Sequence, residues 1–280
     1  MKLAYRKVQK IMNNAKDFTG AMMRLYLYVA MHADESGMAR GIYFRDFLEC
    51  TGMTIQSFYG AKNKLEKLGY IQCYKHSWKD IDIKIDDNEF DSYEATKEGY
   101  INLNMKLFHS NEFWRLLDNE MIMALDFLKN SLSSEGGCYR IKKDRYYEKY
   151  KKIFGVRDVA IRKYSKHLQK FFSIGVKKGI VYITPRSETK ERHDKMNETD
   201  QLREYIVKVA VRRTKATIDL KNKKNIMELM MQYGKVAKEC GRNVYEVILC
   251  CIEKSIQISK EKRIQPAYIH KLMRQELCIQ

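Results

Sequence analysis

Apolar residues recur at helical spacing in two parts of the chain, residues 52–71 and 155–174, which align when the sequence is shifted by 103 positions. In both segments the apolar residues stand three or four positions apart, and such spacings place side chains on one face of a helix. The matched pairs are Phe58 and Ile161, Ala61 and Tyr164, Leu65 and Leu168, and Leu68 and Phe171. The pattern predicts one amphipathic helix in each segment.

Gly52 and Gly155 stand at the same position of the two segments, shortly before the predicted helix. Glycine adopts a positive φ at little cost, which a tight turn between two helices requires. Apolar positions before each glycine predict a shorter helix there. A third helix is predicted further back in each half, with its apolar face formed by Met22, Leu25 and Val29 in the first half and by Met121, Leu125, Leu128 and Leu132 in the second.

Alternating apolar and polar residues follow each long helix, as is typical of β-hairpins. We expect strand pairs at residues 70–74 with 81–85 and at residues 174–176 with 180–183, and short strands before them at residues 40–42 and 138–141. Three helices followed by a hairpin make a winged helix-turn-helix. The predicted fold is therefore mainly α with small β-hairpins (α+β), and it contains two such domains in tandem.

Changes in this pattern give the domain boundaries. Residues 1–100 and 101–185 are predicted to form the two winged-helix domains, and residues 186–200, which lack apolar periodicity, a flexible linker. Helical spacing returns in residues 201–280, which predicts a helical C-terminal domain. Its last helix is expected to open at Pro266, where the missing N–H of proline costs nothing.

The formal net charge is +18, which favours a polyanionic partner such as nucleic acid. Residues 139–178 alone carry 14 basic and three acidic side chains. Phosphates neutralised by such groups release counterions, so this segment is the best candidate for DNA binding. Residues 80–98 carry eight acidic side chains, and we expect them to form an exposed excursion from the first hairpin.

In a helix-turn-helix the second helix enters the major groove, so its polar positions outside the apolar face are the candidate DNA contacts. In the first domain these are Thr54, Gln56, Ser57, Tyr59, Lys62 and Asn63, with Lys75 and Lys79 on the hairpin. In the second they are Lys142, Lys143, Arg145, Arg157, Arg162, Lys163 and Lys166, with Lys177 and Lys178 on the hairpin. The first set has neutral groups suited to adenine, and the second suits guanine or phosphate. The alternative for each set is an ordinary solvated helix face.

Aromatic residues of the second domain suggest another mode of binding. Tyr146, Tyr147 and Tyr150 could stack on bases, as in single-strand binders. The spacing of three between Tyr147 and Tyr150 instead favours packing of these two rings in the core.

Motifs for other classes of function are missing from the sequence. It has no GxxxxGK[ST], GxGxxG, GxSxG or HExxH motif, and its six histidines are scattered singly. The seven cysteines form no zinc-binding pattern, so reduced thiols are expected. With no apolar run of transmembrane length and no signal peptide, we expect a cytoplasmic, non-enzymatic protein with no membrane partner, cofactor or metal.

Residues 23–71 resemble the amino-terminal winged helix of bacterial and phage replication proteins and of many small regulators. Two such units in tandem over residues 15–185 resemble plasmid replication initiators. The tail from Val244, with Tyr268 and Ile269, is similar to the end of the DnaD-like domain of replication-restart and phage replication proteins, although the usual tryptophan after it is lacking.

These resemblances imply a sequence-specific double-stranded DNA-binding protein that initiates plasmid or phage replication at origin repeats. Host replication proteins would then bind its C-terminal domain. The alternative is a transcription or segregation regulator that its helical tail makes a homodimer, and a DNA-processing enzyme is a third reading. Direct repeats of the DNA site would favour the initiator, whereas one inverted repeat would favour a dimeric regulator.

Overall fold

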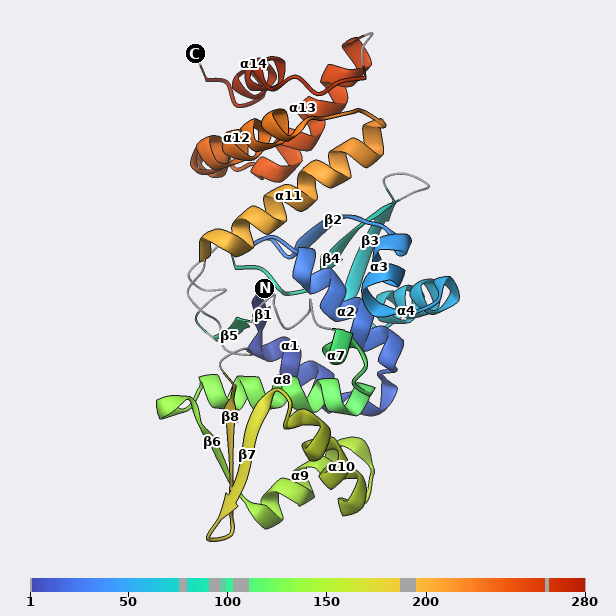
Figure 1. Cartoon of the computed structure of the whole chain (residues 1–280), viewed down its shortest axis with the longest axis vertical. Coiled ribbons are helices and arrows are strands. Elements are labelled where there is room, and N and C mark those ends of the chain that lie inside the picture. Colours follow the sequence, from blue (N-terminus) through green and yellow to red (C-terminus); the bar gives the residue numbers. More distant parts are fainter. Residues whose placement is uncertain are drawn as a thin grey trace. The chain divides into compact units, whose positions relative to one another are not determined.

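The computed structural model describes residues 2–75, 80–90, 97, 99–102, 111–186, 195–259 and 262–279. The protein is mostly helical with small antiparallel sheets, as expected for an α+β fold (Figure 1). Its described residues form two compact units, which divide between residue 186 and residue 195. The larger unit holds both predicted hairpins, and the smaller unit is helical.

The first half of the larger unit contains the elements predicted around Gly52, preceded by a strand and a helix that were not predicted. In chain order they are β1 (Lys2–Ala4), α1 (Tyr5–Asn13), the 3-10 turn η1 (Ala15–Asp17), α2 (Gly20–His32), β2 (Met38–Ile42), α3 (Phe44–Thr51), α4 (Ile55–Lys67), β3 (Ile71–Lys75) and β4 (Ile81–Ile85). The last three strands form an antiparallel sheet of order β2-β4-β3. Gly52 ends α3 with a φ of 68°, the left-handed conformation that the turn requires.

The second half repeats this order. It consists of β5 (Tyr100–Asn102), α7 (Asn111–Trp114), α8 (Asp118–Leu132), η2 (Glu135–Gly137), β6 (Tyr139–Lys142), α9 (Lys143–Phe154), α10 (Asp158–Leu168), β7 (Phe172–Lys177) and β8 (Ile180–Pro185). The sheet has the order β6-β8-β7, with the hairpin's second strand again in the centre. Gly155 ends α9 with the same φ of 68°.

The predicted apolar faces of the long helices form the core. Phe58, Ala61 and Leu65 of α4 are buried, and Ile161, Tyr164 and Leu168 of α10 are buried in the same way. Two residues depart from the prediction, because Leu68 is 44% exposed and Leu132 is 46% exposed. Leu68 follows the last residue of α4 and Leu132 ends α8, so both lie beyond the part of the helix that the core covers.

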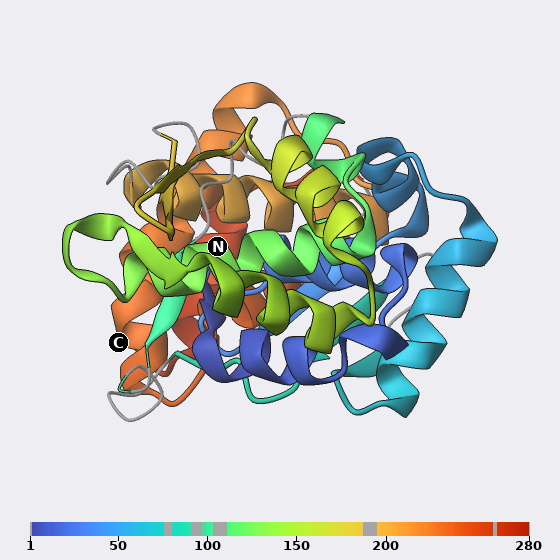
Figure 2. The same ribbon diagram turned by 90° about the horizontal axis from the view of Figure 1, so that it is seen from below.

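One hydrophobic core runs through both halves of the larger unit. α8 packs against α1 and α2 of the first half, and strand β1 pairs with β5. Arg24 of α2 donates hydrogen bonds to the carbonyl oxygens of Trp114 (2.7 Å) and Leu116 (2.8 Å), just before α8. Seen from below, α9 and α10 lie in front of α8 (Figure 2). Residues 100 and 101, between which a domain boundary was predicted, therefore lie within a single compact unit.

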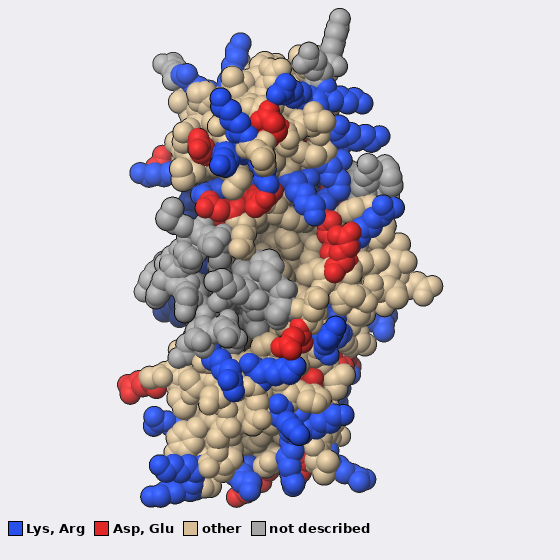
Figure 3. Space-filling model, viewed as in Figure 1, with Lys and Arg blue, Asp and Glu red and all other residues tan. Residues whose placement is uncertain are grey.

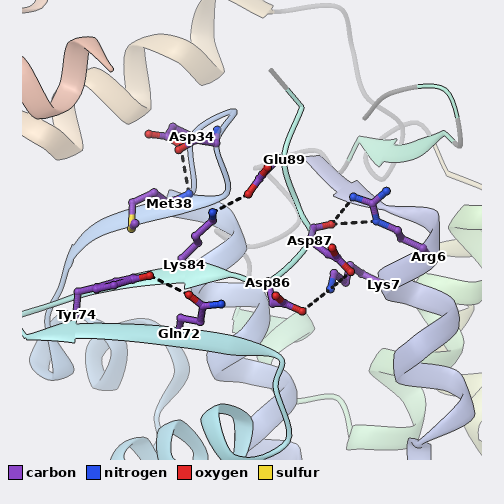
Figure 4. A network of polar contacts seen from close by, with 11 residues as sticks. Arg6, Lys7, Asp34, Met38, Gln72, Tyr74, Lys84, Asp86, Asp87 and Glu89 are labelled. Atoms are coloured by element: carbon purple, nitrogen blue, oxygen red, sulfur yellow. Dashed lines mark hydrogen bonds and ion pairs between the residues drawn. The ribbon is translucent and has the colours of Figure 1, made fainter. Parts of the chain in front are cut away.

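The acidic residues after β4 fold back on α1 (Figure 4). Lys7 is 1% exposed, and its Nζ lies 3.5 Å from Oδ2 of Asp86 and 3.4 Å from Oδ2 of Asp87. Arg6 donates two hydrogen bonds to the carbonyl oxygen of Asp87, at 3.1 and 2.8 Å. The prediction of an exposed excursion is wrong for residues 80–90, because the cations of α1 bind this segment.

Further observations complete this correction. Asp80 and Asn88 are buried, and Asn88 Oδ1 accepts a hydrogen bond from the backbone N–H of Ala4 (3.0 Å). Burial lowers the pKa of Lys7, although Asp87 and Asp86 act in the opposite direction. The rest of the predicted excursion, residues 91–96 and 98, lies outside the described residues.

The smaller unit contains four helices within its described residues. They are α11 (Lys195–Thr214), α12 (Leu220–Glu239), α13 (Val244–Ile258) and α14 (Pro266–Glu276), which surround their own apolar core. Pro266 is the first residue of α14, as predicted. The linker prediction is wrong for residues 195–200, which form the first turns of α11, and residues 187–194 lie outside the described part.

Candidate nucleic-acid interface

Helix α10 presents a basic face to solvent. Ile161, Tyr164 and Leu168 point into the core, so the polar positions of the helix between them face outward. Arg157, which precedes the helix, and Arg162, Lys163 and Lys166 within it are all exposed. None of these four side chains forms an ion pair with another described residue. They are therefore available to bind an anionic partner.

A second group of cations lies at the turn between β7 and β8. Lys142 and Lys177 are paired with the same residue, Ile180, from the two strands that flank β8. Lys178 and Gly179 form the two-residue turn, both with positive φ (50° and 72°), as in the turns that suit tight hairpins. Figure 3 shows Lys and Arg side chains gathered at this end of the unit.

The start of α9 joins this group. The backbone N–H of Lys143 donates a hydrogen bond to the carbonyl oxygen of Gly179 (2.9 Å), so the side chains of Lys143 and Arg145 begin beside the turn. Both side chains are exposed. The turn and the first residues of α9 thus form one cationic surface, which we call the wing cluster: Lys142, Lys143, Arg145, Lys177 and Lys178.

Three contacts hold α9 and α10 in place. Asp126 of α8 accepts hydrogen bonds from Lys149 Nζ and from the Tyr150 hydroxyl, both at 2.5 Å. The hydroxyls of Tyr146 and Ser165 are 2.7 Å apart and connect α9 to α10. Burial by itself would lower the pKa of Lys149, but the Asp126 carboxylate outweighs burial and raises it. Lys149 is therefore a structural cation rather than part of the basic surface.

The predicted site residues of α4 divide into two groups. Thr54 and Ser57 stabilise the helix start, since Thr54 Oγ1 accepts from the Ser57 N–H (3.2 Å) and lies 2.9 Å from the Ser57 hydroxyl. Lys62 forms an ion pair with Glu66 (3.0 Å). The exposed side chains are Thr54, Gln56, Tyr59 and Asn63. The Tyr59 ring packs against Phe44 and Phe58, whereas Gln56 and Asn63 contact no described residue through a hydrogen bond or ion pair.

Two predicted contacts belong to the first hairpin. Lys75 ends strand β3, and Lys79 lies outside the described residues. The first half therefore shows no wing cluster comparable to that of the second half among its described residues.

Sequence reasoning missed one residue of α10. Val159 is 72% exposed and stands on the outward face two residues after Arg157. The selection of polar residues alone excluded it. The alignment of the two halves at a shift of 103 positions could have indicated Val159, because it places Val159 opposite the candidate contact Gln56.

The tyrosine cluster of α9 is mainly structural. Tyr146 and Tyr150 are buried, and their rings pack against Phe127. Tyr147 is half-buried and packs against the core, so the prediction of core packing holds fully for Tyr150 and in part for Tyr147. Tyr146, which was not predicted to point inward, is buried as well. The rings of Tyr146 and Tyr150 are not free to stack on bases.

Comparisons of the chain with protein-family models, with curated proteins and with solved structures give no match. Among the described residues, no group of three His, Cys, Asp or Glu side chains is placed to hold a metal ion. Nor does any described helix combine the length and hydropathy of a membrane span. Charge and geometry in the larger unit are therefore the best guide to function.

Proposed function

We propose that each half of the larger unit is a winged helix and that the protein binds double-stranded DNA in a sequence-specific manner. The repeated order of helix, strand, two helices and hairpin, and the sheet orders β2-β4-β3 and β6-β8-β7, support this assignment. In this scheme α4 and α10 are the helices that enter major grooves.

The observation that carries the proposal is that the second half exposes two sets of cations, the basic face of α10 and the wing cluster. An α-helix fits the major groove, where Arg and Lys bind guanine edges. A cationic hairpin in the same half can bind phosphates, which fix the orientation of the protein on the duplex. Both surfaces lack ion-pair partners among the described residues, so binding DNA breaks no described ion pair.

The two halves differ in what they would contribute. Arg162, Lys163 and Lys166 supply charge for phosphates or guanine, whereas Gln56 and Asn63 of α4 supply the neutral groups that can pair with adenine. Val159 would contact the methyl group of thymine, since an exposed valine among cations on a groove-facing helix offers an apolar surface to the bases.

We further propose that the protein is a cytoplasmic replication initiator of a plasmid or phage, without enzymatic activity, that binds origin repeats and recruits host replication proteins through its helical unit. The tandem halves support this role, since a chain with two helices that each recognise a DNA sequence is suited to a series of repeated sites. A protection footprint on the DNA that flanks its own gene tests it. Direct repeats are expected, and a single inverted repeat would instead indicate a dimeric regulator.

Salt dependence tests the duplex interface itself. If about five phosphates are neutralised, the logarithm of the binding constant should fall against the logarithm of salt concentration with a slope of about −4 to −5. Replacing both Arg162 and Lys163 with Ala should weaken binding to all duplexes and reduce the slope by about 2. The charge-preserving variant Arg162→Lys with Lys163→Arg is the control and should keep the slope. Affinity that does not change with salt would contradict the proposal.

A further inference from the structure

The sheet β6-β8-β7 has an outer face that the core does not use. Residues paired across antiparallel strands project to the same side, so the pairings assign each side chain to a face. Val181 and Ile183 are buried and define the inner face. The outer face then carries three cross-strand rows, none with a buried side chain: Arg140, Tyr182 and Gly175; Lys142, Ile180 and Lys177; and Thr184 with Ser173.

The outer face has a single sign of charge. Arg140, Lys142 and Lys177 are exposed, and none forms an ion pair with another described residue. The strands β6, β7 and β8 contain no acidic residue. An anionic chain can therefore lie across all three strands without meeting a carboxylate of the sheet.

Tyr182 stands in the middle of this face with open space on one side. The guanidinium carbon of Arg140 lies 6.0 Å from the centre of the Tyr182 ring. On the other side the paired residue is Gly175, and a Cβ added there would meet no atom within 4 Å. The ring is thus supported by a cation on one strand and faces an unfilled position on the next. A planar group can occupy that position.

We infer that this face binds a single strand of DNA, with one base stacked on Tyr182 and its phosphates on Arg140, Lys142 and Lys177. Single-strand binders combine a cationic surface that follows the backbone with aromatic rings on which bases stack. A duplex does not offer a base for stacking, because each base face is already covered by its neighbours. An acidic peptide would satisfy the cations, but it would leave the position beside Tyr182 unused.

This site is separable from the duplex interface. Lys142 and Lys177 belong to both surfaces, but Arg140 and Tyr182 lie two residues further from the turn and are not among the duplex contacts of α10. Binding of a single strand does not depend on the proposed winged-helix readout. The two activities can therefore fail independently.

The test measures the affinity of the full chain for a labelled 12-nucleotide oligothymidine and for a duplex, by fluorescence anisotropy. Tyr182→Ala should weaken oligothymidine binding at least about fivefold, because the ring that stacks on the base is removed, whereas Tyr182→Phe should not. Gly175→Val adds a side chain beside the ring; its Cβ meets no atom within 4 Å, and valine suits a strand. It should weaken oligothymidine binding to a similar extent, with unchanged circular dichroism and melting temperature.

The duplex arm gives the control. Tyr182→Ala should leave duplex affinity within about twofold, and the double replacement of Arg162 and Lys163 by Ala should reduce duplex affinity while oligothymidine binding remains. The inference is overturned if wild-type protein does not bind oligothymidine, if Tyr182→Ala leaves that binding unchanged, or if it weakens both ligands equally. Competition by polyglutamate of equal charge, as effective as oligothymidine, would also overturn it. Loss of duplex binding alone would contradict the proposed function and leave the single-strand site standing.

Discussion

The carboxylate of Asp126 in α8 lies 2.5 Å from the hydroxyl oxygen of Tyr150 in α9, and both side chains are buried. The same carboxylate oxygen accepts from Lys149. These contacts fix α9, which in turn fixes α10 through the Tyr146 and Ser165 hydroxyls. The basic face of α10 is thus held by polar contacts that connect α8, α9 and α10, and not by apolar packing alone.

Asp126→Asn should therefore lower the free energy of unfolding of the larger unit by about 1–3 kcal/mol. The amide cannot replace the charge-assisted hydrogen bonds to Lys149 and Tyr150, although it fills the same space. Urea unfolding followed by circular dichroism measures the change. Asp144→Asn, at an exposed position in the first turn of α9, is the control and should change the stability by less than about 0.5 kcal/mol. Equal stability of the two variants would contradict the structural role of Asp126.

Stability should also fall at alkaline pH. Burial raises the pKa of Tyr150 and of Tyr146 above the ordinary value of 10.0, so the fold favours the neutral phenols. Groups whose pKa is higher in the folded state contribute stability that is complete below the unfolded-state pKa and is lost as the pH rises through the folded-state pKa. The raised pKa of Lys149 acts with the same sign.

Ionisation of these groups should therefore leave the melting temperature unchanged up to about pH 10 and lower it at higher pH. Thermal unfolding followed by circular dichroism between pH 8 and pH 12 measures the melting temperature, and tyrosinate absorbance measures the ionisation of the tyrosines. In urea all the tyrosines should ionise together near pH 10. Full ionisation near pH 10 with the helices still folded would show that the phenols of Tyr146 and Tyr150 are not protected by burial.

Discrimination between DNA sequences should depend on α4. Replacing Gln56 or Asn63 with Ala should reduce the preference for the footprinted site over random duplex by about 1–3 kcal/mol for each base that the side chain recognised. Lys64→Gln is the matched control on the same helix, because Lys64 is exposed but is not one of the candidate contacts, and it should leave the preference unchanged. The ratio of the two affinities is the measurement. An unchanged ratio in both the Gln56 and the Asn63 variants would show that α4 does not recognise the DNA sequence.

The role of the helical unit can be tested by ending the chain after Arg186. Pro185 is buried and paired with Phe172, and the Arg186 N–H donates to the Phe171 carbonyl oxygen (2.9 Å), so a cut before these residues would damage the sheet. We expect the shortened protein to bind duplex DNA as tightly as the full chain. A plasmid that carries the footprinted origin should no longer be maintained. Continued maintenance would rule out recruitment through the helical unit.

The sequence predicted the elements whose causes are local. Gly52 and Gly155 mark the turns because the left-handed conformation excludes most other residues, and Pro266 marks a helix start for a similarly local reason. The hairpins follow from alternation over a few residues. The basic face of α10 was also found in this way, since a helical repeat of apolar residues shows which positions remain outside the core.

Contacts between distant segments were not predicted. Lys7 and Asp86 are 79 positions apart, and a run of acidic residues without its partner in view has the pattern of a solvated surface. Pairing of β1 with β5 joins segments almost a hundred residues apart and leaves no local signal. Val159 was missed for a different reason, because only polar residues outside the apolar repeat were selected as candidate contacts.

The single core that joins the two halves of the larger unit has a consequence for the DNA. If α4 and α10 both enter grooves, neither can adjust to the other, because α8 packs against both α1 and α2 of the first half. The distance and the rotation about the DNA axis between the two sequences that α4 and α10 bind would then be fixed. Inserting about five base pairs, half a turn of the duplex, between those sequences would place them on opposite sides of the DNA, and only one helix could engage at a time.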